Sequence, residues 1–272
     1  MNLCNRVRGF YTLETYRAEK TEDGLREIPG SRSRRAEFEN LITDLGLNRL
    51  GDRSPASSAY FCYVGSGSSA PAQTDTDMDN FIAVHSVLQS DTRSAQASID
   101  PWYLSTQKVN RFNQGVAAGN LSEVGMGWDS NPSGALFSRA LIQDADGNPS
   151  SITVLDDEYL DVTYELRIYP NLGDFTGTIT IDGVDYNYTA RACRANTAAP
   201  GAWDFDFPGN NGAYSYAYAG EIGDVSGYPA GTNAGGTPAL VTYNYGSLRA
   251  SVQLTWALNS ANFSDGVRSV AL

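Results

Sequence analysis

The sequence is poor in the residues on which most catalytic and metal-binding sites depend. Its 272 residues include a single histidine, His85, and three cysteines, Cys4, Cys62 and Cys193. An odd number of widely separated cysteines is neither a disulfide framework nor a zinc motif, and it favours free thiols in a reducing compartment. We expect no metal and no cofactor.

Positive charge and long apolar runs are also scarce. The 19 Lys and Arg residues against 31 Asp and Glu give a net charge of -12, which argues against a nucleic-acid partner because phosphate binding needs basic residues. No run of about 18 apolar residues is present, and no secretory segment follows Met1, so we expect a soluble protein made in a cytoplasm, without membrane insertion. The basic residues cluster once along the chain, at Arg26, Arg32, Arg34 and Arg35. We interpret this cluster as a solvated loop or, alternatively, as a contact with an acidic neighbouring subunit.

Glycine and tyrosine are abundant, with 27 and 16 residues, and indicate short strands joined by frequent turns. Residues 160–169 alternate apolar and polar side chains, which predicts a strand with one buried and one wet face. Asp182-Gly183 is a two-residue hairpin signal, and Asp146-Gly147 is expected to join strands at 137–142 and 152–155 in the same way. The predicted fold is mainly β, with antiparallel β-sandwich domains.

The N-terminal part is expected to add one short helix to a strand at residues 9–18. The helix is predicted from apolar residues at helical spacing, with glycines as stop signals: Phe38, Leu41, Ile42, Leu45, Gly46 and Gly51. We expect three segments: a strand-helix segment at 1–60, a β-sandwich domain at 61–195, and a Gly/Tyr-rich β extension or second β domain at 196–272.

The last of these segments holds the candidate contact residues. Tyr214, Tyr216 and Tyr218 would lie on one face of a strand, as an interface or receptor contact. A final hairpin is expected to turn at Gly246. The strand-like run at 266–272 suggests a shortened sequence or a strand that pairs with a neighbouring subunit.

Two segments resemble known binding motifs but lack residues that those motifs require. Gly65, Gly67 and Ala70 resemble a dinucleotide loop, but a proline and an acidic segment follow where a helix should begin. Asp75, Asp77 and Asp79 alternate like calcium ligands, but the glycine and glutamate that an EF-hand loop requires are missing. We interpret these aspartates as turn or helix-cap carboxylates.

The other candidate residues are more simply interpreted as residues of the core or of an interface. His85 lies in an apolar segment, and no nucleophile-elbow motif surrounds any serine. Carboxylates that a glycosidase could use as a pair are present at Asp156, Asp157 and Glu158 and at Asp204 and Asp206. Aromatic residues that could stack on sugars include Trp102, Trp128, Trp203 and Trp256. We expect core or interface aromatics and no enzyme.

The order of several segments resembles a module of tailed-bacteriophage structural proteins. The segments are 9–14 (GFYTLE), 38–47 (FENLITDLGL), 64–76 (VGSGSSAPAQTDT), 123–128 (EVGMGW), 136–142 (LFSRALI) and 153–169 (TVLDDEYLDVTYELRIY). The resemblance covers about residues 9–190. Ser66 and Ser68 depart from it, since threonines are common there, and the part after residue 196 matches nothing in the module.

The resemblance implies a virion protein without a catalytic site, assembled in the host cytoplasm as a tail, tail-tip or baseplate, collar or fibre component. Its partners would be further copies of itself, in a trimer or ring, and other virion proteins. Two alternatives are a host-receptor protein that binds a surface glycan or pilus, and a capsid decoration protein. A glycan-cleaving enzyme would depend on Asp157 or Asp204.

Overall fold

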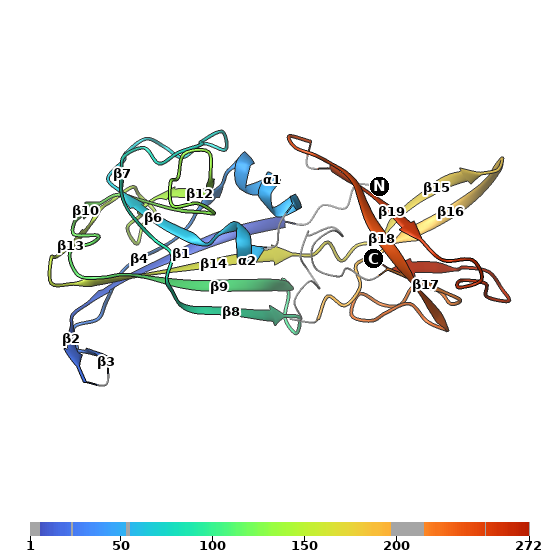
Figure 1. Cartoon of the computed structure of the whole chain (residues 1–272), viewed down its shortest axis with the longest axis horizontal. Helices are drawn as coiled ribbons and strands as arrows, with labels where there is room; N and C mark the ends of the chain where they lie inside the picture. Colours follow the sequence, from blue (N-terminus) through green and yellow to red (C-terminus); the bar gives the residue numbers. More distant parts are fainter. Residues whose placement is uncertain (1–5, 23, 53–54, 197–214, 248, 272) are drawn as a thin grey trace. The chain divides into compact units, whose positions relative to one another are not determined.

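The computed structural model describes residues 6–22, 24–52, 55–196, 215–247 and 249–271 and divides the chain into two compact units (Figure 1). The sandwich unit comprises Arg8–Arg93 and Ser105–Arg167, and the ribbon unit comprises Met1–Val7, Ser94–Leu104 and Ile168–Leu272. Each unit combines segments that lie far apart in the sequence, whereas the three expected segments were contiguous. The expectation of a mainly β fold with antiparallel sheets is confirmed.

The described residues of the sandwich unit form two five-stranded sheets, with strand orders β4-β1-β14-β9-β8 and β5-β12-β11-β6-β7. The strands of the first are β1 (Arg6–Tyr16), β4 (Ser33–Glu39), β8 (Leu88–Gln96), β9 (Tyr103–Phe112) and β14 (Tyr159–Tyr169). Those of the second are β5 (Leu41–Ile42), β6 (Phe61–Gly65), β7 (Phe81–His85), β11 (Glu123–Gly127) and β12 (Leu136–Leu141). Two small pairs complete the unit: β2 (Ala18–Thr21) with β3 (Gly24–Glu27), and β10 (Gly119–Leu121) with β13 (Ile152–Val154).

The two sheets pack face to face. The hydroxyl oxygens of Tyr11 on β1 and Ser138 on β12 lie 3.0 Å apart, and the rings of Tyr164 on β14 and Phe137 on β12 meet edge to face with centroids 6.4 Å apart. All four residues are buried, so these contacts join the inner faces of the sheets. Burial of each large apolar side chain stabilises the fold by about 1.5–3 kcal/mol.

Strand β14 confirms the alternation predicted for residues 160–169. Leu160, Val162, Leu166 and Ile168 point inward and are buried. The opposite face is less wet than predicted, because Asp161 is buried there, its carboxylate accepting hydrogen bonds from the Arg111 and Arg32 guanidinium groups.

The predicted helix is present but begins later than its apolar spacing indicated. Helix α1 covers Asp44–Asp52, and the single turn α2 (Pro55–Ser58) follows. Phe38 lies in β4, and Leu41 and Ile42 form β5, so the prediction of helix over these residues was wrong. Over so few residues, apolar spacing does not distinguish a helix from short strands.

Thr43 determines where α1 begins. Its hydroxyl accepts a hydrogen bond from the Gly46 backbone N–H at 3.0 Å, as an N-cap residue does, and donates to the carbonyl of Leu136 at 2.6 Å. Gly46, expected as a stop signal, lies inside the helix. A Cβ there would sit 2.1 Å from the carbonyl oxygen of Phe137, so glycine permits close contact between α1 and β12.

The turn at Asp146-Gly147 also differs from its prediction. Gly147 has a φ of 82°, and Asp144 accepts hydrogen bonds from the backbone N–H groups of Asp146 and Asn148, so a turn does form. The strand that follows, β13, pairs with β10 rather than with β12. A local turn signal fixes the reversal of the chain but not the pairing of a strand several residues later.

The described residues of the ribbon unit form a two-stranded ribbon and a four-stranded sheet. The ribbon pairs β15 (Phe175–Ile181) with β16 (Val184–Ala190). The sheet has the order β19-β18-β17-β20, with β17 (Ser215–Tyr218), β18 (Asn233–Asn244), β19 (Arg249–Thr255) and β20 (Ser269–Ala271). The final hairpin turns at Gly246 as predicted. The C-terminal strand β20 pairs with β17 of the same chain and lies at the edge of the sheet, so its pairing with a neighbouring subunit stays a prediction.

Candidate interaction surface

The β15–β16 ribbon owes its shape to its turn. Asp182 and Gly183 have φ values of 50° and 80°, as a type I′ turn requires, and this turn matches the twist of the flanking strands. Ile181 pairs with Val184 next to the turn, and Ile179 pairs with Tyr186 two positions further along.

This register separates the side chains into two faces. Directly opposed residues share a face, and alternate pairs point to opposite sides. One face, which we call the apolar face, consists of Phe175, Gly177, Ile179, Ile181, Val184, Tyr186, Tyr188 and Ala190. The other, the polar face, consists of Thr176, Thr178, Thr180, Asp185, Asn187 and Thr189. Hydroxyl groups on the polar face donate across the strands, from Thr178 to Asn187 at 3.0 Å and from Thr180 to Asp185 at 2.5 Å.

The outer half of the apolar face is uncovered. Ile179, Ile181, Val184 and Tyr186 are 50%, 52%, 52% and 51% exposed. In the described part of the chain the ribbon pairs with no third strand, and an isolated two-stranded ribbon is only marginally stable in water. Large contiguous apolar surfaces of this kind mark interaction sites in soluble proteins.

Two contacts hold the inner half of the ribbon. Arg191 binds the carboxylate of Asp174 through two hydrogen bonds of 2.6 Å and donates to the carbonyl of Gly223 at 2.8 Å, which ties the base of the ribbon to the rest of its unit. Tyr188 lies across Gly177, where a Cβ would sit 2.6 Å from the tyrosine hydroxyl oxygen. The ribbon is therefore fixed at its base and presents an apolar outer end.

The tyrosines proposed as contacts lie elsewhere in the ribbon unit. Tyr214 is outside the described residues. Tyr216 and Tyr218 lie on one face of β17, as expected, with ring centroids 6.2 Å apart. Tyr218 is only 4% exposed, so little of its ring is available to a partner. Their role as contacts stays a prediction.

The loop at residues 65–80 of the sandwich unit, which contains Asp75, Asp77 and Asp79, is built around an ion pair that the sequence did not indicate. Glu123 and Arg139 are 0% and 2% exposed, and the Arg139 Nε atom donates to Glu123 at 2.8 Å. Arg139 also contacts Asp75 at 2.9 Å. Asp79 accepts hydrogen bonds from the backbone N–H groups of Ser68 and Ser69 at 2.8 and 2.9 Å, and these bonds lower the pKa of its carboxyl group.

The glycines of the same loop are explained by Glu123 rather than by a nucleotide. The Glu123 carboxylate accepts hydrogen bonds from the backbone N–H groups of Gly67, Asp79 and Asn80. A Cβ at Gly65 or at Gly67 would lie 2.5 Å from its Oε1 atom. The loop is thus shaped by a carboxylate of its own chain, and Asp75 and Asp79 act structurally, in agreement with their interpretation as turn carboxylates.

His85 is half-buried at the end of the edge strand β7. Its ring lies 5.6 Å from that of Phe112, and its Nδ1 atom accepts a hydrogen bond from the Val87 backbone N–H at 3.3 Å. Burial lowers the pKa of its imidazole. These contacts agree with a packed histidine.

Several of the remaining acidic and basic candidates contact a side chain or the backbone of the same chain. Asp157 forms an ion pair with Arg17 at 2.8 Å, and Glu158 accepts a hydrogen bond from the Leu155 N–H. Asp204 and Asp206 lie outside the described residues. Each clustered arginine has a partner in its own chain: Arg26 binds Glu19, Arg32 binds Glu14, Glu27 and Asp161, Arg34 binds Glu37, and Arg35 donates to the Thr153 carbonyl.

Cys62, Cys193, Trp128 and Trp256 are also explained by contacts within the chain. Cys62 and Cys193 are free thiols, and burial raises the pKa of both, which keeps them protonated and unreactive. Cys4 and Trp203 lie outside the described residues. Trp128 lies 5.1 Å from the Arg49 guanidinium group, and Trp256 donates to the Ala234 carbonyl at 3.1 Å.

Among the described residues, no group of three or more His, Cys, Asp or Glu side chains is placed to hold a metal ion. Within the same residues, no helix has the length and apolar character needed to cross a membrane. Comparison of the chain with protein-family models, curated proteins and solved structures found no match.

Proposed function

We propose that this protein is a non-enzymatic structural subunit of a tailed-bacteriophage particle and that it associates with further copies of itself through the apolar face of the β15–β16 ribbon. The exposed outer half of that face carries the proposal. The resemblance of residues 9–190 to phage structural proteins supports the assignment to the particle.

A second copy of the chain is the partner that fits this face. The chain has a net charge of -12, so most surfaces of two copies repel each other. The apolar face contains no Asp, Glu, Lys or Arg, and its outer end presents Ile179, Ile181, Val184 and Tyr186. Two such ribbons packed face to face would form a small sandwich of four strands, which removes the weakness of an isolated pair.

The association is tested by the mass of the purified full chain in solution, measured by light scattering after size-exclusion chromatography. We expect an assembly of two or more copies. The double substitution Ile179→Thr and Ile181→Thr keeps branched side chains that favour strands but adds hydroxyl groups to the face. We expect this variant to dissociate.

The matched control is the double substitution Thr176→Ser and Thr178→Ser on the polar face of the same strand. It should leave the mass unchanged, and circular dichroism should give the same strand content for all three proteins. A single copy at every concentration, or an assembly that survives the double threonine variant, would contradict the proposed interface.

The location in a phage particle needs a separate measurement. Mass spectrometry of purified, intact phage particles from cells that produce the protein should detect its peptides in a fixed ratio to other particle proteins. Peptides found only in the cell lysate, and not in washed particles, would overturn the assignment to the virion.

A further inference from the structure

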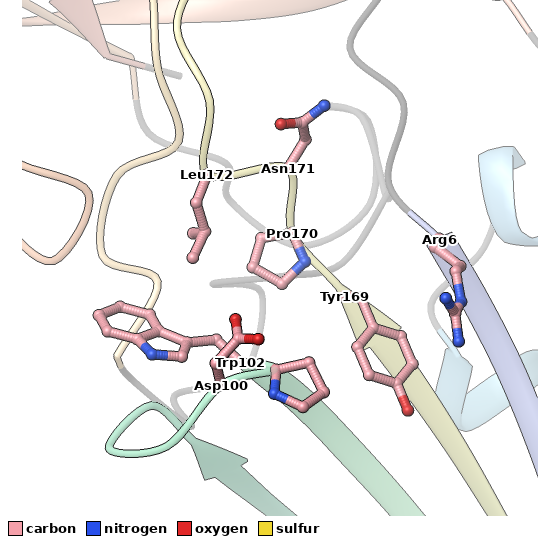
Figure 2. A pocket seen from close by; sticks show the side chains of 8 residues that line it. Arg6, Asp100, Trp102, Tyr169, Pro170, Asn171 and Leu172 are labelled. Carbon is pink, nitrogen blue, oxygen red and sulfur yellow. The ribbon is translucent and has the colours of Figure 1, made fainter.

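The ribbon unit contains a pocket of about 360 Å³ that the proposed association does not use. Three segments of the chain meet there: the start of β1 at Arg6, the loop before β9 at Asp100 and Trp102, and the end of β14 with the residue that follows it, at Tyr169 and Pro170 (Figure 2). The volume lies at the lower end of the range of small-molecule sites, about 300–1,000 Å³, and suits a ligand of one or a few rings.

Two aromatic side chains, Trp102 and Tyr169, line the pocket, and other residues of the ribbon unit pack against both. Trp102 packs against a buried cluster of Leu104 and Ala195. The ring of Tyr169 contacts the ring of Tyr103, with centroids 5.5 Å apart, and the guanidinium group of Arg6, which lies 5.1 Å from the Tyr169 centroid. Fixed aromatic surfaces bind a flat apolar face of a ligand with little loss of side-chain freedom.

The pocket also contains one carboxylate and one guanidinium group that do not pair with each other. In the described part of the chain, Asp100 forms no hydrogen bond or ion pair, and Figure 2 shows its carboxylate between Trp102 and Pro170. Arg6 stacks on Tyr169, and its N–H groups donate no hydrogen bond to any described residue. Acceptors on one side and donors on the other are therefore available to a ligand.

These features select one class of ligand. A purely apolar ligand would remove both charged groups from water without replacing their hydrogen bonds, which is costly. An anion would face Asp100, and a cation would face Arg6. A neutral sugar ring has an apolar C–H face for the aromatic rings, hydroxyl groups that donate to a carboxylate, and oxygens that accept from a guanidinium group.

We propose that this pocket binds a neutral saccharide, with Trp102 and Tyr169 stacking on the sugar ring, Asp100 accepting from its hydroxyl groups and Arg6 donating to its oxygens. The proposal is independent of the ribbon interface, because none of these residues belongs to β15 or β16.

Saturation-transfer NMR on the full chain tests the site, with methyl glycosides of glucose, galactose, mannose and N-acetylglucosamine as probes. We expect transfer to at least one glycoside, concentrated on the ring protons. Asp100→Asn should weaken binding by about tenfold or more, because it removes a charged acceptor. Trp102→Phe should weaken binding less than Trp102→Ala.

The control is Tyr228→Ala. Like Tyr169, Tyr228 is a tyrosine of the ribbon unit that contacts an arginine, with the Arg194 guanidinium group 5.0 Å from its ring centroid, but it lies outside the pocket. Its substitution should leave binding unchanged. Because Asp100 is exposed, Asp100→Asn tests the site even if the tryptophan variants do not fold. No transfer to any glycoside, equal binding by Asp100→Asn and the wild type, or binding of glycine as a zwitterionic probe in place of sugars would overturn the proposal.

Discussion

Strand β14 and the β15–β16 ribbon carry the same kind of pattern with opposite outcomes. In both, apolar residues alternate with polar ones and share one face. The apolar residues Leu160, Val162 and Leu166 of β14 are buried by the second sheet of the sandwich unit, whereas Ile179 and Ile181 of the ribbon remain half exposed. Alternation therefore determines which face is apolar, but coverage of that face depends on what the rest of the chain, or another chain, supplies.

The polar groups of the sandwich unit and of the ribbon also differ in their exposure to solvent. In the sandwich unit, charged groups such as Glu123 and Arg139 are buried and joined by several hydrogen bonds. In the ribbon, the hydrogen bonds between polar side chains lie on the solvent side. The sandwich unit thus buries its charged groups and apolar faces within one chain, whereas the outer half of the ribbon's apolar face stays exposed. Four experiments test this contrast.

The largest effect is expected from Glu123→Ala in the sandwich unit. The substitution breaks the buried ion pair with Arg139 and removes the acceptor of the backbone N–H groups of Gly67, Asp79 and Asn80. Loss of such a buried partner lowers the free energy of unfolding by about 3–5 kcal/mol. Urea unfolding measures the change. Glu37→Ala, which breaks the exposed pair with Arg34, is the control and should change the free energy by less than about 1 kcal/mol. Similar losses in both variants would mean that burial of the Glu123 network adds nothing to stability.

The most direct comparison replaces one apolar residue in each region. Leu166→Ala on β14 should lower the free energy of unfolding by about 2–5 kcal/mol, because it leaves a cavity in a closed core. Ile179→Ala on the ribbon should cost less than about 1 kcal/mol in the dissociated chain, because that side chain is already half in water. The order should reverse for association, which only the ribbon variant weakens. A cost at Ile179 equal to that at Leu166 would mean that the ribbon is covered within its own chain.

Sequence patterns predicted several of the strands correctly and the contacts between strands poorly. The alternation of residues 160–169 and the Asp182-Gly183 turn identified β14 and the ribbon correctly because both signals are local. The pairing of β13 with β10 was missed because it depends on the packing of distant segments. The Glu123 network was missed for the same reason, since nothing in the sequence links Glu123 to the loop at residues 65–80.

The candidate surface could be predicted only in part. The alternating Thr176, Thr178 and Thr180 already indicate that one face of the hairpin is polar and the opposite face apolar. Whether that face is covered cannot be read from a local pattern. For the pocket, the sequence indicated only Trp102, as one of several aromatic residues that could stack on a sugar. The pocket itself could not be predicted, because its three segments are separated by most of the sandwich unit along the chain.

A smaller effect, local to the ribbon, is expected from Gly183→Ala. Its φ of +80° disfavours any side chain, at a cost of about 1–2 kcal/mol. The ribbon amides should then exchange their hydrogens about 5 to 30 times faster, whereas those of β14 should keep their rates. Gly227→Ala in the same unit, with an ordinary φ and its nearest neighbour 3.4 Å from the new Cβ, should leave exchange in the ribbon unchanged. Faster exchange in β14 as well would indicate that the ribbon and the sandwich unit unfold together.

The smallest effect concerns how stability changes with pH. We expect it in the sandwich unit alone, because His85, the chain's single histidine, lies there. Burial lowers the pKa of His85 in the folded state, so below about pH 6.5, the ordinary pKa of histidine, the unfolded chain binds the proton more readily. This contribution to stability is fully present above that pH and is lost as the pH falls. The decrease in Tm between about pH 7.5 and about pH 5.5 should therefore be smaller in His85→Asn than in the wild type. The mass of the assembly should stay constant over the same interval, because the apolar face of the ribbon contains no histidine and no carboxylate. An equal decrease in Tm in both proteins, or dissociation on acidification, would show that the pH response arises outside β7.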